Sequence, residues 1–106
     1  MQGQELRDFI VDKIADIKAR DVAVLNVSKK SDIADYLVIC SGNSNTHVRS
    51  IANHVALEAK HRGFPAIGIE GESDSEWVLV DFGDVILHVM QDVTRDFYQL
   101  EKLWGH

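Results

Sequence analysis

The sequence YLVICSG, residues 36–42, is the apolar run that decides the class of fold. It shows no alternation of polar and apolar residues, which is typical of a strand buried on both faces in the middle of a sheet. Gly42 closes the run, and apolar residues then recur at helical spacing through residues 48–59 until Gly63 stops the pattern. The order strand, glycine turn, helix predicts an α/β fold.

Two elements are predicted before this strand. Apolar residues at three- and four-residue steps, separated by charged residues, predict an amphipathic helix that ends near Arg20; they are Leu6, Phe9, Ile10, Ile14 and Ile17. The β-branched segment DVAVLNV (21–27) predicts a strand, and the polar segment SKKSDIAD (28–35) predicts a loop. A helix and a strand therefore lead into the central strand.

Further strands are predicted after the second helix. AIGIEG (66–71) reads as a short strand, and ESDSE (72–76) reads as a polar connection. EWVLVDFGDVILHV (76–89) contains two apolar strands that fold back on each other around the turn at residues 81–84. This hairpin completes a sheet of about five strands.

The C-terminal segment TRDFYQLEKLW (94–104) predicts one final helix, with Phe97, Leu100 and Trp104 at helical spacing. Asp92 or Thr94 can serve as its N-cap. The predicted order is αββαββα, a small mixed five-stranded sheet with helices. A chain of 106 residues can build one modest core, so we expect a single domain over residues 1–106.

The composition indicates which kind of partner and which cellular compartment to expect. Eleven Lys and Arg residues against 17 Asp and Glu residues give a net charge of -6, which disfavours direct binding of nucleic acid phosphates and favours a basic partner. The single Cys40 cannot form an internal disulfide and lies in an apolar run, so we expect a buried, unreactive thiol in a reducing compartment. The charged N-terminal sequence fits neither a signal peptide nor a membrane span, so we expect a cytoplasmic protein.

Two patterns could carry phosphate chemistry. The turn SGNSNTH (41–47) leads into a helix N-terminus, where backbone N–H groups attract anions, but no P-loop is present and Ser44 is explained as an N-cap. Asp81 and Asp84 could hold Mg²⁺ for nucleotidyl transfer, although Asp and Gly are also ordinary residues of a tight turn. The structural interpretation is favoured for both patterns, and an Mg²⁺-dependent nucleotidyltransferase-like enzyme using the two aspartates remains the alternative function.

Three histidines recur at seven-residue steps in the second helix, at positions 47, 54 and 61. Two helical turns correspond to about 10.5 Å of rise, which is too far for neighbouring members to share one metal ion at bond lengths near ~2 Å. We therefore expect a solvated or partner-facing stripe, and we predict no metal site and no cofactor.

Alternation along the hairpin strands separates two faces of the sheet. One face is purely apolar and should face the helices; it carries Val78, Val80 and Phe82 with Val85, Leu87 and Val89. The other mixes apolar and polar side chains: Trp77, Leu79 and Asp81 with Asp84, Ile86, His88 and Met90. Apolar anchors rimmed by polar groups are typical of a protein-binding surface, and the alternative is that a helix covers this face.

The segments DIADYLVICSGNSNTHVRSIANHV, GIEG, WVLVDFGDVILHVM and TRDFYQLEKLW resemble the ribosomal silencing factor family, also called the Iojap-related family. The resemblance extends from about Ile10 to Trp104. It implies a nucleotidyltransferase-like fold without the catalytic apparatus. Nucleotidyltransferases have a Gly-Ser turn followed by an Asp-x-Asp motif on the next strand, whereas in this chain the SGNS turn is followed by a helix and no Asp-x-Asp occurs. We therefore expect a protein that is not an enzyme.

The resemblance also implies a function and a set of contact residues. Members of this family bind the large ribosomal subunit through its fourteenth protein and block joining of the small subunit, which lowers translation when nutrients are scarce. The implied partner-binding residues are Trp77, Leu79, Asp81, Asp84, His88 and Met90, with Tyr98 and Lys102 as weaker additions. A homodimer that uses the same surface remains a further possibility.

Overall fold

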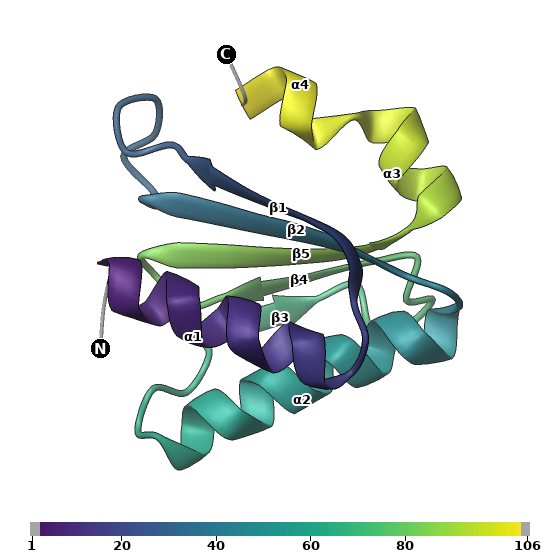
Figure 1. Cartoon of the computed structure of the whole chain (residues 1–106), viewed down its shortest axis with the longest axis horizontal. Coiled ribbons are helices and arrows are strands. Elements are labelled where there is room, and N and C mark those ends of the chain that lie inside the picture. Colours follow the sequence, from purple (N-terminus) through teal and green to yellow (C-terminus); the bar gives the residue numbers. More distant parts are fainter. Residues whose placement is uncertain (1–2, 105–106) are drawn as a thin grey trace.

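The computed structural model describes residues 3–104 and shows one sheet between two layers of helices (Figure 1). The elements, in chain order, are α1 (Gly3–Asp16), β1 (Arg20–Asn26), β2 (Tyr36–Gly42), α2 (Asn45–His61), β3 (Gly68–Glu70), β4 (Trp77–Asp81), β5 (Val85–Gln91), α3 (Asp92–Tyr98) and α4 (Leu100–Trp104). The predicted α/β class and the five strands are confirmed. The three strands that the segments after the second helix predicted are all present, one more than the order αββαββα contains, and the final helix is divided.

The strands are arranged in the order β1-β2-β5-β4-β3. The central pair, β2 and β5, is parallel, whereas every other neighbouring pair is antiparallel. In the parallel pair, Tyr36 lies beside Val85 at one end and Gly42 lies beside Gln91 at the other. This register determines which turns meet at each end of the sheet.

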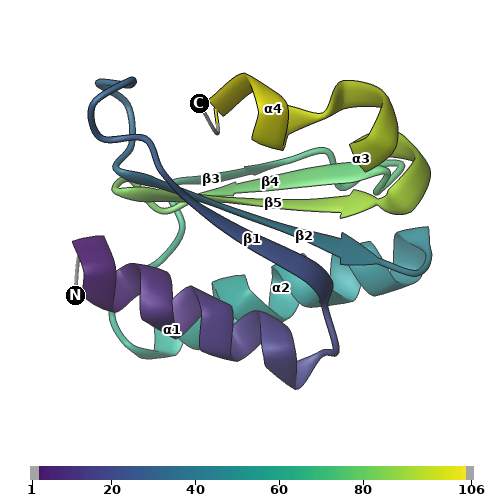
Figure 2. The same ribbon diagram turned by 45° about the horizontal axis from the view of Figure 1, so that its top comes forward.

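One face of the sheet is covered by α1 and α2, which lie side by side beneath it (Figure 2). Each helix turns an apolar stripe toward the strands, and burial of such a stripe supplies most of a helix's stability in a folded protein. The stripe of α1 contains Leu6, Ile10 and Ile14. From the sheet, this core receives Val38, Cys40, Val78, Val80, Val85, Leu87 and Val89, all without exposed surface.

The junction between β2 and α2 follows the sequence-based expectation. All seven residues of β2 are buried, and a Cβ atom at Gly42 would come within 2.8 Å of the Val48 side chain, so only glycine permits this close approach. The Ser44 hydroxyl caps α2 by accepting a hydrogen bond from the His47 backbone N–H at 3.1 Å. Cys40 is buried as expected, and this burial raises the pKa of its thiol to about 12, which disfavours the reactive thiolate.

Two helix boundaries differ from the expected ones. Helix α1 ends at Asp16 rather than near Arg20, because Lys18 adopts a left-handed backbone conformation with a φ of 59°. The C-terminal helix is interrupted at Gln99, where φ is 50° and ψ is 52°. Gln91 occupies the N-cap position of α3 without a side-chain hydrogen bond, so the predicted capping by Asp92 or Thr94 is not observed.

The second face of the sheet is only partly covered. Helix α3 contacts β5 and β2, and α4 contacts β1, so both short helices lie mainly over one half of the sheet (Figures 1 and 2). The half formed by β4 and β3 is less protected on this side. Within residues 3–104, no helix combines the length and the apolar character needed to cross a membrane.

Candidate protein-binding surface

Three aromatic side chains meet where the sheet borders α3. The rings of Trp77 and Tyr98 lie 4.9 Å apart between centroids, and Phe97 meets Tyr98 edge-on at 5.0 Å. Tyr98 is 54% exposed and Phe97 is 78% exposed. We call these three residues together with Leu79 the aromatic surface.

Strand β4 supplies two members of the aromatic surface through its alternation. Its residues alternate between half-buried and buried positions, so Trp77 and Leu79 point to the same side while Val78 and Val80 enter the core. Trp77 and Leu79 also line a surface depression of about 210 Å³ with Glu70 and Gly71. The predicted division of the hairpin into two faces is thus observed.

The break at Gln99 brings Phe97 to the aromatic surface. In one continuous helix, Phe97 would share a stripe with Leu100 and Trp104. In the structure, Leu100 and Trp104 line a cavity against the sheet, whereas Phe97 turns outward with Val93. The sequence predicted Phe97 as a packing residue, and its exposure depends on a left-handed Gln99 that the sequence pattern does not signal.

A partly buried ion pair holds the two short helices in place. The Arg95 guanidinium, on α3, donates a hydrogen bond to the Ser41 hydroxyl of β2 at 2.8 Å. Two of its nitrogens also contact the carboxylate of Glu101, on α4, at 3.2 Å. Because a bidentate guanidinium–carboxylate pair restrains both partners, it fixes the corner on which Tyr98 is carried.

His88 and Met90 lie beneath the aromatic surface. His88 is 8% exposed, and its Nδ1 accepts a hydrogen bond from the Trp77 indole N–H at 3.0 Å. Met90 is the cross-strand neighbour of Trp77 and has no exposed surface. The expectation that these two side chains form accessible contacts is therefore corrected: in this conformation both support Trp77 from below.

The two aspartates of the hairpin turn lie apart from Trp77. Asp81 accepts a hydrogen bond from the Gly83 N–H at 2.8 Å, and Asp84 accepts one from the Gly3 N–H at 3.2 Å. Asp81 lies four residue steps along the strand from Trp77, about 13 Å away. The Asp84 carboxylate reaches the start of α1 instead of the face that carries Trp77, which corrects its predicted position.

Lys102, the last of the predicted partner-binding residues, is exposed on α4. It also borders a small depression of about 150 Å³ with Arg95 and Glu101. Lys102 is thus accessible on the surface, and its role in partner binding stays a prediction.

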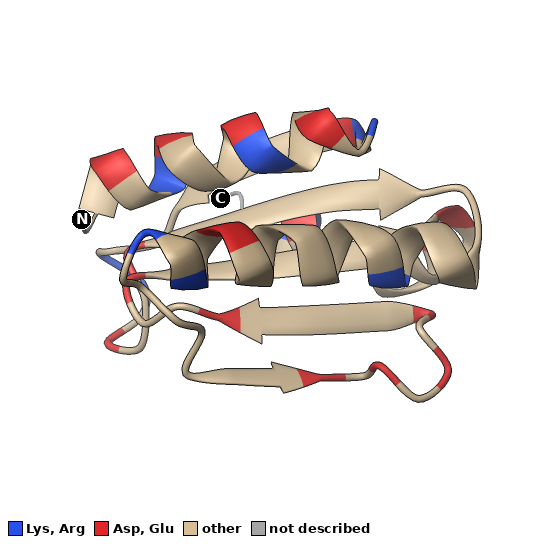
Figure 3. Cartoon of the chain, turned by 90° about the horizontal axis from the view of Figure 1, so that it is seen from below, with Lys and Arg blue, Asp and Glu red and all other residues tan. Residues whose placement is uncertain are grey.

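Acidic residues surround the aromatic surface on the side of β3 and β4. No Lys or Arg occurs between Arg62 and Arg95, whereas this stretch contains seven acidic residues: Glu70, Glu72, Asp74, Glu76, Asp81, Asp84 and Asp92. Figure 3 shows the acidic positions at the ends of both strands and along their connection. Glu70, Glu72, Asp74 and Glu76 therefore form an acidic border along the β3–β4 edge of the sheet.

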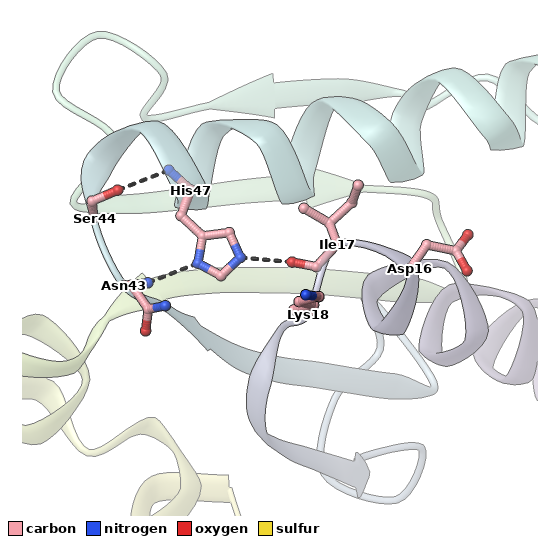
Figure 4. A pocket seen from close by; sticks show the side chains of 6 residues that line it. All are labelled: Asp16, Ile17, Lys18, Asn43, Ser44 and His47. Carbon is pink, nitrogen blue, oxygen red and sulfur yellow. Dashed lines mark hydrogen bonds between the residues drawn. The ribbon is translucent and has the colours of Figure 1, made fainter.

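A larger depression, of about 490 Å³, lies at the turn between β2 and α2 (Figure 4). On its wall, His47 accepts a hydrogen bond at Nδ1 from the Asn43 N–H at 2.8 Å, which leaves its Nε2–H to donate to the Ile17 carbonyl at 2.6 Å. Two turns further along α2, the His54 imidazole contacts the Asp16 carboxylate at 3.0 Å. These two histidines join α2 to α1, so the expectation of a solvated or partner-facing stripe is wrong for both.

The elements of a nucleotidyl-transfer site are not brought together. The Gly42 turn lies at the C-terminal end of β2, whereas Asp84 lies near Tyr36 at its other end, since the Asp84 carbonyl accepts from the Tyr36 N–H at 3.1 Å. A seven-residue strand is about 20 Å long. Among residues 3–104, no three His, Cys, Asp or Glu side chains form a group that could hold a metal ion.

The sequence of this chain is similar to proteins of one described family. The family model described as "Ribosomal silencing factor during starvation" matches residues 2–106. Ribosomal silencing factor RsfS from Chromobacterium violaceum is 39% identical, covering 99% of this chain and 86% of that protein, and its Bacillus subtilis counterpart is 42% identical, covering 85% and 76%. A mouse protein named "Mitochondrial assembly of ribosomal large subunit protein 1" is 37% identical, covering 92% of this chain and 44% of that protein.

Solved structures agree with these sequence relationships. A crystal structure of a Chromobacterium violaceum protein superposes with a TM-score of 0.96 at 39% identity, covering 99% of this chain and 88% of that chain. A crystal structure from Bacillus halodurans gives a TM-score of 0.88 at 39% identity, covering 96% and 95%. The resemblance found in the sequence is confirmed, and the chain belongs to the ribosomal silencing factor family.

Proposed function

We propose that this protein represses translation by binding the large ribosomal subunit through its fourteenth protein and blocking the approach of the small subunit when nutrients are limiting. The observation that carries the proposal is the aromatic surface, in which Phe97 and Tyr98 are largely exposed and Trp77 is half-buried. Exposed aromatic residues that contact one another are costly to leave in water and are typical of binding hot spots. Family membership and the mouse relative's name, which refers to the ribosomal large subunit, support the choice of partner.

The charge around the aromatic surface supports a protein partner of opposite sign. Ribosomal proteins are typically basic, and the acidic stretch between Arg62 and Arg95 borders Trp77 directly through Glu76. Complementary potentials increase the rate of encounter and fix the orientation of two proteins. The same acidic edge repels exposed RNA phosphates, so we expect this chain to bind a ribosomal protein rather than ribosomal RNA.

The proposed mechanism is steric occlusion and needs no chemical step. Asp81 and Asp84, which the enzymatic alternative would use, both accept backbone hydrogen bonds within the chain and lie at the far end of β2 from the Gly42 turn. A titration with nucleoside triphosphate and Mg²⁺ tests that alternative. Saturable binding that is lost in Asp81→Asn would favour the enzyme and count against occlusion.

The main test is sedimentation of the protein with large subunits, small subunits and an associating mixture. Wild type should migrate with large subunits only and should reduce the peak of joined ribosomes. Truncating a hot-spot aromatic typically costs about 2 kcal/mol or more, so Trp77→Ala should weaken binding at least ~30-fold. Phe97→Ala is a second variant that leaves the core intact, because that side chain is 78% exposed.

Leu57→Ala provides the matched control. Leu57 is 52% exposed on α2, on the opposite side of the sheet, so its truncation removes a similar apolar surface without touching Trp77. Normal binding by folded Trp77→Ala and Phe97→Ala would contradict the proposed surface. If wild type instead forms a concentration-dependent dimer that Trp77→Ala abolishes, and does not bind subunits, the surface serves self-association.

A further inference from the structure

The indole N–H of Trp77 donates a hydrogen bond to Nδ1 of His88. The two residues lie on neighbouring strands, and their ring centroids are 5.8 Å apart with a tilt of 49°. On its other side the indole contacts the Tyr98 ring. Trp77 is therefore held between a buried acceptor and an exposed aromatic neighbour.

We propose that His88 is a positioning residue, which fixes the orientation of the Trp77 indole for partner binding without touching the partner itself. The inference rests on the proposed function and assigns His88 a different role from direct contact. A tryptophan side chain has two rotatable angles, and the hydrogen bond at the indole nitrogen, together with the tilted contact to the Tyr98 ring, restrains both. Restraining an anchor before binding removes part of the ordering cost of association.

The surroundings of His88 keep its ring in the form that this role requires. Nδ1 must lack a proton to accept from the indole, so the neutral ring carries its proton on Nε2. The ring lines a cavity of about 190 Å³ together with Leu37, Leu79, Ile86, Leu100 and Trp104, and the remaining lining residues, Val27, Ser31, Ile33 and Ala34, also carry no charge. Burial lowers the pKa of His88 to about 4, so the acceptor is available throughout the neutral range.

Two substitutions separate the hydrogen bond from the bulk of the ring. His88→Phe replaces the imidazole by a flat aromatic ring of similar size that has no acceptor, whereas His88→Asn retains an oxygen that can lie near the Nδ1 position. We expect His88→Phe to weaken binding of large subunits about 3- to 10-fold, the scale of one side chain losing its fixed rotamer. His88→Asn should restore most of the affinity.

The indole N–H of Trp77 provides a readout that does not depend on ribosomes. In ¹H–¹⁵N spectra, its hydrogen exchange should accelerate in His88→Phe and remain slow in His88→Asn, while the backbone N–H groups of α2, on the opposite side of the sheet, serve as the internal reference. In wild type, the Trp77 indole resonance should shift in one step near pH 4, because protonated Nδ1 can no longer accept. This titration needs no substitution and remains informative if His88→Phe does not fold.

The outcomes distinguish this inference from the proposed function. Wild type that binds large subunits, together with a folded His88→Phe that binds equally well, would overturn the positioning role and leave the proposed function intact. A Trp77 indole resonance whose chemical shift does not change when His88 is protonated would also overturn the positioning role. Wild type that fails to bind large subunits would remove the proposed function, and the positioning role would fall with it.

Discussion

The two faces of the sheet differ in how far helices cover them and in the side chains that they carry. Leu87 and His88 are consecutive residues of β5, yet Leu87 enters the closed core under α1 and α2 while His88 lies beneath the aromatic surface. Over the three central strands β2, β5 and β4, the first face is apolar and is covered by two long helices. The second is covered by two short helices over half its width and places Trp77 at the border.

This difference indicates which face contributes most to the free energy of unfolding and which face binds a partner. A face closed by long helices can contribute apolar burial but offers nothing to a partner. A partly open face loses some of that burial and gains accessible aromatic side chains held by buried ones. Substitutions on the first face should therefore change the free energy of unfolding, and substitutions on the second should change binding by the folded molecule.

The largest expected effect is on the closed face, at Leu87. Leu87→Ala removes a side chain with no exposed surface from a central strand, and such truncations cost about 2–5 kcal/mol of unfolding free energy. Urea denaturation followed by circular dichroism measures the loss. The fraction that stays folded should bind large subunits with unchanged affinity, and a defect in that fraction would show that the two faces are not separable.

A comparable effect is expected on the second face when the pH is lowered. His88 has a pKa of about 4 in the folded chain against the ordinary 6.5, so between these values the unfolded chain binds a proton that the folded chain does not. The free energy of unfolding should therefore fall as the pH falls from about 6.5 to 4. Each pKa unit corresponds to about 1.4 kcal/mol, so the full loss is about 3 kcal/mol.

The control for this pH effect is His88→Phe, which has no proton to take up at that position. Carboxylates also titrate in this range, and hydrogen bonds from His54 and Arg20 hold the pKa of Asp16 and Asp92 below its usual value. Their contribution is common to both proteins and cancels in the difference. Parallel stability curves for wild type and His88→Phe between pH 6.5 and 4 would contradict a neutral, buried His88.

Much of the fold could be predicted because its signals are local. The apolar run of β2 and the stripe of α2 each follow from a few neighbouring residues, and both were observed. The division of the C-terminal helix could not be predicted, since Gln99 has no sequence feature that marks a left-handed conformation. That single backbone feature turns Phe97 outward.

In the candidate site, only the features that follow from the alternation of side chains along a strand could be predicted. Alternation placed Trp77 and Leu79 on one side of β4, as observed. The burial of Met90 depends on what covers the strand, and the direction of Asp84 depends on a hydrogen bond to Gly3 at the other end of the chain. Contacts between residues distant in sequence decide such details, and no pattern along the chain encodes them.

The smallest expected effect concerns the acidic border of the second face. Glu76 is exposed next to Trp77, and Glu76→Lys should slow association with large subunits about 3- to 10-fold at low salt while leaving dissociation nearly unchanged. Glu5→Lys, on α1 and under the closed face, makes the same change in net charge and serves as the control. Stopped-flow or surface-based kinetics at rising salt should show the difference between the two variants disappear, because screening removes interactions beyond about 10 Å at ~0.1 M ionic strength. Equal slowing by both variants would mean that the whole charge of the chain, and not the border of the aromatic surface, guides the encounter.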